Sequence, residues 1–371
     1  LADALLNSGP ATMSPEDFKA TLRAMTADYS VILHNEWTEI NLNVPKEDLN
    51  AALKLFTELL QSPKITEANI KSAEAGKSID VDENGVIIDA NINVAVEKFH
   101  EVILEGHILG KKPMSGDFNV LSISDVEAFK DSYLIPNNIT ISVSGDIFEG
   151  QIKDKIKTKF GKWSKGAVPA WIEVPKVKHE KVKHHYYPAD KLQTWVVIGH
   201  ALPEMSPKDQ VIFEVMNYIM AGGHFWTRMF IETRDKYGFT NDASGYIEDH
   251  WYGSGSYSFH TSSRHEVTEQ NYDNIMTVIY EMQKSLVTDE ELMIAKNALA
   301  DGVFEMRFKD GNATARSFAI EQLRYRNHEA SASYKNRVWA VTKEDVLKVA
   351  KDFMHPDAFQ VIVVGEDIDL Q

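Results

Sequence analysis

Residues 123–146, ISDVEAFKDSYLIPNNITISVSGD, recur 220 positions later in the chain as residues 343–367, KEDVLKVAKDFMHPDAFQVIVVGED. The two stretches align without a gap. Six aligned pairs are identical or similar: Asp125 and Asp345, Val126 and Val346, Tyr133 and Phe353, Pro136 and Pro356, Val143 and Val363, and Gly145 and Gly365. Each copy predicts a capped helix, a stop at proline and an apolar strand that ends at glycine. The repeat therefore indicates two copies of one structural unit.

A second pair of stretches supports the duplication. Residues 49–70 resemble residues 272–293, and each stretch predicts an amphipathic helix, a threonine-led cap and a further helix. We therefore expect an α+β fold made of two homologous α/β half-units, with antiparallel-rich sheets flanked by helices. The half-units are predicted at 1–160 and 191–371, joined by a Pro- and Lys-rich connector at 161–190.

The second half-unit has an apolar strand for which the first has no counterpart. This strand is residues 193–199, QTWVVIG, and its equivalent in the first copy would fall ahead of Leu1. If the two copies are equal in length, we expect roughly 50 to 60 residues of the first unit to precede Leu1.

The composition limits the classes of partner. The net charge of −16 disfavours nucleic acid and an anionic membrane surface, because their negative charge would repel the chain. The 371-residue chain has no cysteine, so it forms no disulfide and performs no thiol chemistry, which fits the cytosol and the periplasm equally. No run of about 18 apolar residues is present, so no membrane span is predicted.

Two histidines, His100 and His107, are the first candidates for a metal site. The stretch 98–107, KFHEVILEGH, combines them with two glutamates on an apolar helical pattern. Two helical turns separate the histidines by about 10 Å, whereas bonds to zinc are about 2 Å long. The stretch therefore predicts a structural helix rather than a metal site.

Four strings of the sequence form a pattern in their order and spacing. They are AGGHFWTRMFIETRDKYGF at 221–239, LQTWVVIGHALP at 192–203, PNNITISVSGD at 136–146 and SPKITEANI at 62–70. Together they resemble the pitrilysin/insulinase-like zinc peptidases, which include the mitochondrial processing peptidases, over essentially the whole chain. The resemblance implies a processing-peptidase-like metallohydrolase fold. In such a fold, two halves or subunits close around a chamber where an extended peptide adds as a strand to a sheet edge.

The resemblance also implies where zinc ligands belong. The family's His-x-x-Glu-His motif should end five residues before the glycine that matches Gly9, and its first histidine falls ahead of the first residue. Ala4 then stands at the second histidine and Asp3 at the glutamate; alanine cannot bind zinc, and aspartate is one methylene shorter than the required general base. The expected third ligand falls near Asp80, with Glu74 nearby. The resemblance thus implies no catalytic residue and no metal ligand in this chain, with zinc held by a partner subunit.

The same resemblance implies residues that bind substrate. Arg234 stands at the place of an arginine that holds the substrate backbone, and Asn241 stands where a tyrosine follows seven residues later. The alternative interpretation is that Arg234 pairs with Glu232 or Asp235 on its own helix. The other implied substrate-binding residues are Tyr246, His224 in the glycine-rich turn, and Tyr29 and Val31 in the sheet-edge strand 27–35.

Three hypotheses follow for the function. We favour a non-catalytic, peptide-binding subunit of a heterodimeric zinc metallopeptidase; its substrate is an extended peptide, and its partner is a homologous zinc-bearing subunit or a second copy. One alternative is an active zinc metalloendopeptidase whose His-x-x-Glu-His lies ahead of the first residue, so that this chain itself binds zinc. The other alternative is a structural assembly subunit. The sequence does not determine the compartment, and the periplasm is preferred because bacterial relatives of this kind are often exported.

Overall fold

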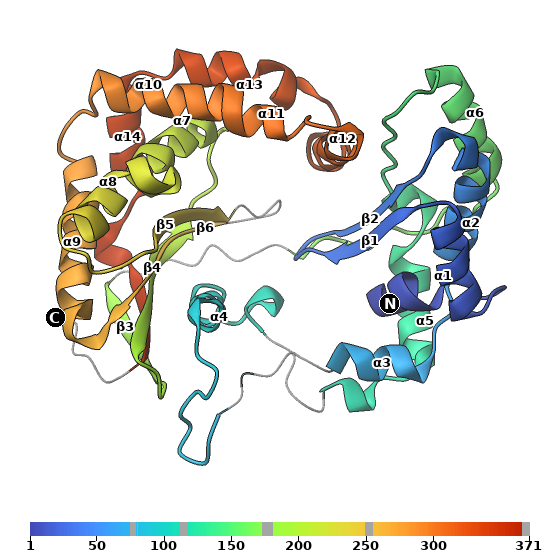
Figure 1. The fold of residues 1–371 in the computed structure, drawn as a ribbon, viewed down its shortest axis with the longest axis horizontal. Coiled ribbons are helices and arrows are strands. Elements are labelled where there is room, and N and C mark those ends of the chain that lie inside the picture. Colours follow the sequence, from blue (N-terminus) through green and yellow to red (C-terminus); the bar gives the residue numbers. More distant parts are fainter. Residues whose placement is uncertain (75–78, 80, 112–116, 173–180, 249–254, 366–371) are drawn as a thin grey trace. The chain divides into compact units, whose positions relative to one another are not determined.

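The computed structural model describes residues 1–74, 79, 81–111, 117–172, 181–248 and 255–365, and the chain divides into two compact units (Figure 1). Unit 1 comprises Leu1–Ser78, Pro113–Trp171 and Arg307–His328, and unit 2 comprises Ile79–Lys112, Ile172–Met306 and Glu329–Gln371. Both units combine helices with strands, so the expected α+β class is confirmed. Among the described helices, none has both the length and the hydrophobicity needed to cross a bilayer.

Unit 1 contains a β-hairpin packed on helices. Strands β1 (Asp28–Leu33) and β2 (Thr38–Asn43) pair antiparallel. Leu5, Phe18 and Leu59 are at the centre of its core, where they exclude water from one face of the hairpin. The helices of unit 1 are η1 (Ala4–Ser8), α1 (Pro15–Ala24), η2 (Lys46–Asp48), α2 (Leu49–Gln61), α3 (Glu67–Glu74), η4 (Asp117–Val120), α5 (Ile123–Tyr133), η5 (Pro136–Asn138), α6 (Glu149–Phe160) and α12 (Gly311–Tyr325).

Unit 2 is built on a five-stranded sheet in the order β3-β7-β4-β6-β5. Strands β3 and β7 are parallel and the other neighbours are antiparallel, as expected. The strands are β3 (Lys183–Pro188), β4 (Gln193–Leu202), β5 (Ala243–Glu248), β6 (Gly255–Arg264) and β7 (Gln360–Gly365). The helices are α4 (Ile92–Ile103), η3 (Ile108–Gly110), α7 (Pro207–Asn217), η6 (Tyr218–Gly222), η7 (His224–Trp226), α8 (Arg228–Phe230), η8 (Ile231–Asp235), η9 (His265–Val267), α9 (Thr268–Met282), α10 (Asp289–Asn297), η10 (Ala298–Val303), α11 (Phe304–Met306), α13 (Glu329–Ala340), α14 (Lys343–Phe353) and η11 (Pro356–Ala358).

Both faces of the central strand β4 are buried. Successive side chains point to opposite faces of a strand, so Val196 and Ile198 enter the large core that includes residues of α7, α9 and α14, whereas Val197 packs in the core that includes α4. On the α4 side, a Cβ at Gly199 would lie 2.8 Å from the Phe99 ring. Glycine at this position therefore allows α4 and β4 to approach closely.

The sequence repeat is confirmed in its helix caps. Ser122 and Asp125 form a capping box at the start of α5, and Thr342 and Asp345 form the same arrangement at the start of α14. The two boxes are separated by the 220-residue offset of the repeat. The threonine-led helix after residues 272–282 also begins at a capping box, that of Thr288.

The predicted apolar strand of the first copy is wrong. In the second copy the strand is β7, which hydrogen-bonds to β3 on one side and β4 on the other. Residues 139–144 form no strand, and within the described part of the chain no segment pairs with them. Ile141 and Val143 are exposed there. A strand requires a hydrogen-bonded neighbour, so apolar alternation alone did not suffice.

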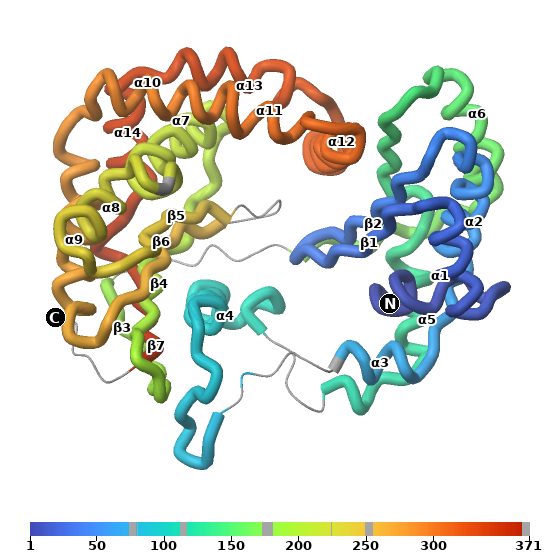
Figure 2. The backbone as a smooth tube through the Cα atoms, viewed as in Figure 1, coloured from blue at the N-terminus to red at the C-terminus, as the bar shows by residue number. Residues whose placement is uncertain are grey.

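Two helices are exchanged between the halves of the sequence. Helix α4 lies in the first half of the chain but belongs to unit 2, whereas α12 lies in the second half but belongs to unit 1. Adding the 220-residue offset of the repeat to the residue numbers of α4 gives positions within α12. The two helices therefore occupy equivalent places in the repeat, and the exchange is reciprocal (Figure 2). The predicted boundaries at 1–160 and 191–371 follow the order of the sequence, but the two compact units do not.

Candidate functional site

The expected zinc position is occupied by a cluster of hydrogen-bonded amides and hydroxyls. Ala4, in the second histidine's place, is fully buried in η1. The Asp3 carboxylate accepts hydrogen bonds from Nδ2 of Asn69 at 2.7 Å, Nδ2 of Asn7 at 2.8 Å and Oγ of Ser72 at 3.2 Å. Asn69 and Ser72 lie on α3, so this cluster joins η1 to α3.

This donor set does not fit zinc. Zinc binds imidazole nitrogen, thiolate sulfur and carboxylate oxygen, whereas Asp3 is surrounded by neutral donors. Burial raises the pKa of Asp3, but hydrogen bonds from Asn69, Asn7 and Ser72 outweigh burial and hold the pKa below its usual value. In the described part of the chain, no group of three or more His, Cys, Asp or Glu residues is arranged to hold a metal ion. Asp80 and the side chain of Glu74 lie outside the described residues.

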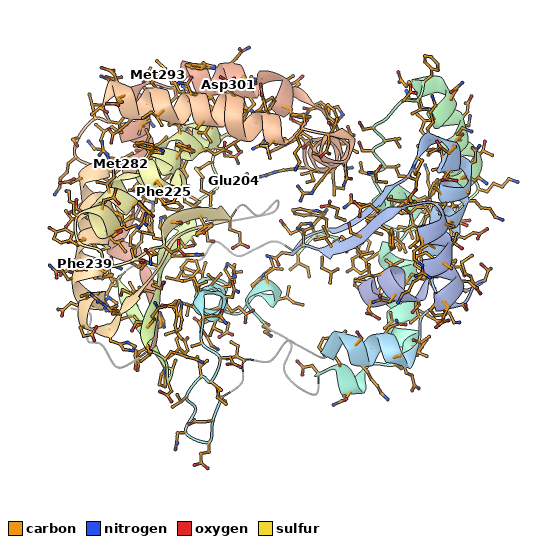
Figure 3. All side chains as sticks on the ribbon, viewed as in Figure 1. Glu204, Phe225, Phe239, Met282, Met293 and Asp301 are labelled. Carbon is orange, nitrogen blue, oxygen red and sulfur yellow. The ribbon has the colours of Figure 1, made fainter. Side chains whose placement is uncertain are left out.

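Arg234 lies against aromatic rings. The carbon of its guanidinium is 4.8 Å from the centre of the Phe230 ring and 5.5 Å from that of Phe225, which is labelled in Figure 3. Glu232, one of its alternative partners, pairs with Lys236. Among the described residues, no hydrogen bond or ion pair engages the Arg234 guanidinium, so the N–H groups at its edge are available to a ligand.

The other predicted residues of unit 2 are divided between separate places. Tyr246 lies on β5, with its ring centre 4.3 Å from that of His260. Asn241 is exposed in the turn between η8 and β5. The backbone of His224 is in η7, but its side chain lies outside the described residues. The structure thus groups Arg234 with Phe225 and groups Tyr246 with His260, and their roles in substrate binding stay predictions.

In unit 1, the predicted residues of β1 pack into the core. The Tyr29 hydroxyl donates to the carbonyl of Leu5 at 2.8 Å, and its ring contacts Phe18 edge-on. Burial raises the pKa of Tyr29 above its usual value. Val31 also packs against this core. The part of β1 that can bind an added strand is therefore its backbone, because within the described residues only β2 pairs with it.

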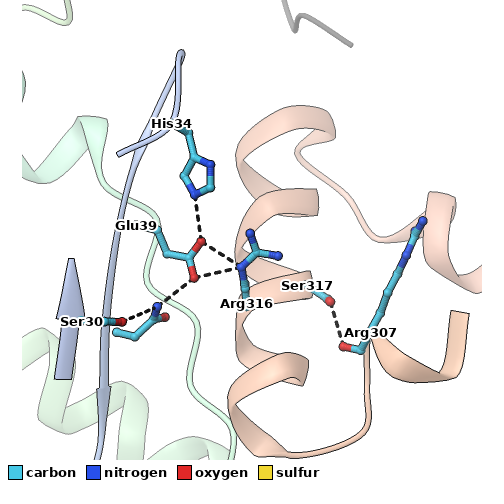
Figure 4. A network of polar contacts seen from close by, with 7 residues as sticks. Ser30, His34, Glu39, Arg307, Arg316 and Ser317 are labelled. Carbon is cyan, nitrogen blue, oxygen red and sulfur yellow. Dashed lines mark hydrogen bonds and ion pairs between the residues drawn. The ribbon is translucent and has the colours of Figure 1, made fainter. Parts of the chain in front are cut away.

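The β1–β2 hairpin is bound to α12 by a charged network (Figure 4). Nε of Arg316 donates to both carboxylate oxygens of Glu39 at 2.9 Å. Glu39 also accepts from Asn41 at 2.8 Å and contacts Nε2 of His34 at 3.2 Å. Burial raises the pKa of Glu39, but the hydrogen bond from Asn41 and the charge of Arg316 hold it below its usual value.

We expect Arg316→Met to weaken the attachment of α12 to the hairpin. Because the Arg316 side chain is 45% exposed, solvent screening limits the coupling between Arg316 and Glu39 to about 1 kcal/mol. A double-mutant cycle of Arg316→Met and Glu39→Gln, read by urea unfolding, measures this coupling. Since folding lowers the pKa of Glu39, the coupling is fully present above the unfolded pKa of about 4.3 and fades as the pH falls through the folded pKa. A coupling that persists after Glu39 is protonated would contradict the assignment.

Sequence reasoning missed a polar cluster on the sheet of unit 2. Nε2 of His100, on α4, lies 2.6 Å from Oε2 of Glu248, and Oγ of Ser258 lies 2.9 Å from Nε2 of His260. Burial and the nearby His100 lower the pKa of His260 to about 4, against the opposing effect of Glu248, so His260 is neutral at neutral pH. The alternation of Ser256, Ser258 and His260 along β6 was the sequence signal for this polar face.

Known proteins resemble this chain in sequence and in fold. Residues 121–299 match the family model described as "Peptidase M16 inactive domain". The "Uncharacterized zinc protease YmxG" of Bacillus subtilis (strain 168) is 19% identical over 351 residues, which cover 94% of this chain and 83% of that protein. The chain is thus similar in sequence to the M16, or pitrilysin-like, peptidases. The matched M16 region includes Arg234 and Tyr246 but not Asp3 or Ala4.

Solved M16 and protease structures share the fold. A protease from Helicobacter pylori aligns with a TM-score of 0.86 and 16% identity, covering 98% of this chain and 88% of its own. A peptidase M16 inactive domain from Pseudomonas fluorescens aligns with a TM-score of 0.85 and 19% identity, covering 99% and 87%. At these identities the similarities show a shared fold and not a shared metal site or substrate.

Proposed function

We propose that this chain is a non-catalytic, peptide-binding member of the M16 family that works with a homologous, zinc-bearing subunit. The observation that carries the proposal is that neutral hydrogen-bond donors, rather than zinc ligands, surround Asp3. Neutral groups of Asn69, Asn7 and Ser72 donate to its carboxylate, and buried Ala4 stands beside it. A metal-activated water would need several ligands and a general base at this place, and the one carboxylate there, Asp3, is engaged by these three hydrogen bonds.

Two features support peptide binding, one in each unit. In unit 1, β1 has its hydrogen-bonding partner on one side, and Ile32 and Leu33 of this strand are exposed. A strand edge of this kind accepts an extended peptide through backbone hydrogen bonds. In unit 2, no group of the described residues takes up the N–H donors of the Arg234 guanidinium, which could bind a carbonyl or carboxylate of the peptide.

One experiment separates a binding subunit from an enzyme. The purified chain is dialysed extensively, its zinc content is measured by elemental analysis, and its binding to a fluorescent extended peptide is measured by anisotropy. We expect far less than one zinc per chain together with saturable peptide binding. A matched peptide with alternate backbone nitrogens methylated should bind much more weakly, because it cannot complete the strand ladder.

A second candidate, a zinc endopeptidase, is favoured by the zinc protease name of the Bacillus subtilis relative. About one zinc per chain, lost on addition of a chelator together with peptide cleavage, would establish it and overturn the first proposal. If the chain contained no zinc and showed no saturable peptide binding, both proposed functions would be contradicted.

A further inference from the structure

An exposed aromatic surface surrounds Arg234. We call Phe225, Trp226, Phe230 and Arg234 the aromatic platform. Phe225 and Trp226 are 62% and 73% exposed, although large aromatic side chains usually bury most of their surface. Phe225 contacts Phe230 edge-on, with their ring centres 4.9 Å apart. The platform therefore presents the rings of Phe225 and Trp226 to solvent, and Phe225 packs on the buried ring of Phe230.

The platform rests on a rigid support. Thr227, directly after Trp226, is fully buried, and its side chain accepts a hydrogen bond from the backbone N–H of Phe230 at 3.1 Å. Arg228 forms two hydrogen bonds with Glu291 of α10, at 2.6 and 2.8 Å. These bonds hold the start of α8, directly after η7, against α10, which reduces the conformational entropy that would be lost when a ligand binds the rings.

Arg234 gives the aromatic platform a preference for a negatively charged ligand. The guanidinium carbon lies over both the Phe225 and Phe230 rings, and the N–H groups at the edge of the guanidinium remain for hydrogen bonding. Glu232 is engaged by Lys236, and in the described part of the chain no carboxylate reaches Arg234. A guanidinium edge beside apolar rings is complementary to a carboxylate whose neighbouring group is aromatic.

We propose that the aromatic platform selects peptides in which a carboxylate side chain lies next to an aromatic one, with the carboxylate on Arg234 and the aromatic ring on Phe225 and Trp226. This inference rests on the proposed peptide-binding function and defines its substrate class. It differs from the basic peptides that the net charge of −16 alone would favour.

The test uses four fluorescent peptides that share a Gly/Ser background and differ at two adjacent positions: Asp-Phe, Asn-Phe, Asp-Ala and Lys-Phe. We expect Asp-Phe to bind about tenfold tighter than each of the others, because each change removes either the carboxylate or the ring. Trp226→Ala and Arg234→Lys should abolish this preference. Phe148→Ala is the matched control, because Phe148 is 79% exposed in unit 1 and should leave all four affinities unchanged.

The possible outcomes test the selectivity of the aromatic platform separately from the proposed peptide-binding function. If the unmodified chain binds all four peptides equally, or if Trp226→Ala keeps the preference for Asp-Phe, the platform assignment is overturned while peptide binding stands. If no peptide binds the unmodified chain, the proposed peptide-binding function fails and the selectivity fails with it. Circular dichroism of each variant checks that the fold is retained.

Discussion

Phe99→Ala is expected to lower the free energy of unfolding by about 3 to 5 kcal/mol. Phe99 is fully buried on α4, where it packs with Val197, Ile362 and Val364 of the sheet. Truncation removes the ring and leaves a cavity against β4, because Gly199 has no side chain that could fill it. Urea unfolding followed by circular dichroism measures the loss of stability. Hydrogen exchange of β4 and β7 shows whether the loss lies in unit 2.

The control for this prediction is Phe148→Ala. Both substitutions remove the same ring, but Phe148 is exposed just before α6, so its loss should not change the free energy of unfolding measurably. If Phe99→Ala raised the exchange only of unit 1, or cost no more than Phe148→Ala, α4 would not be an integral part of unit 2.

Glu291→Ala is expected to cost about 3 kcal/mol. The Glu291 carboxylate accepts two hydrogen bonds from Arg228, and the two side chains are only 26% and 19% exposed. It also accepts from the backbone N–H of Thr288 at 2.7 Å as part of the capping box of α10. The substitution therefore removes the cap and leaves the charge of Arg228 partly buried without its partner.

Glu290→Ala is the matched control, because Glu290 is the adjacent, exposed residue on the same helix. The free energy of unfolding of Glu290→Ala should equal that of the unmodified chain within error. An equal loss of stability in both variants would mean that the charge near the start of the helix, and not the pairing with Arg228, is responsible. Burial raises the pKa of Glu291, but hydrogen bonds from Arg228 and Thr288 hold it below its usual value. The stabilisation by Glu291 should therefore be complete above its unfolded pKa and be lost as the pH falls through the folded pKa.

Local signals in the sequence predicted the elements that depend on local interactions. The capping boxes of Ser122 and Thr342 involve residues three apart, so the repeat was visible directly. Residues 139–144 alternate apolar and polar side chains, unlike the nearly continuous apolar run of β7, and they form no strand, since a strand also depends on its neighbours. The replacement of zinc ligands was inferred at Ala4 and Asp3, whereas the contacts of Asp3 with Asn69 and Ser72 required the tertiary structure.

Two features of the candidate site were not predictable from local pattern. The pairing of His100 with Glu248 joins residues far apart in the sequence, because α4 packs on the sheet of the other half. The orientation of Arg234 toward Phe225 and Phe230 depends on the turn at Thr227, which brings η7 back toward η8. Sequence reasoning named Glu232 and Asp235 as alternative partners because it considered residues on one helix.

The reciprocal exchange of α4 and α12 means that neither half of the polypeptide carries all of its own interior. A recombinant fragment limited to residues 191–371 would contain β4 and β7 but not α4, leaving Val197, Ile362 and Val364 bare to water on one side of the sheet. Such a fragment would be prone to aggregate. Because each compact unit is assembled from three separate segments of the chain, no single cut would release either unit with its own core complete.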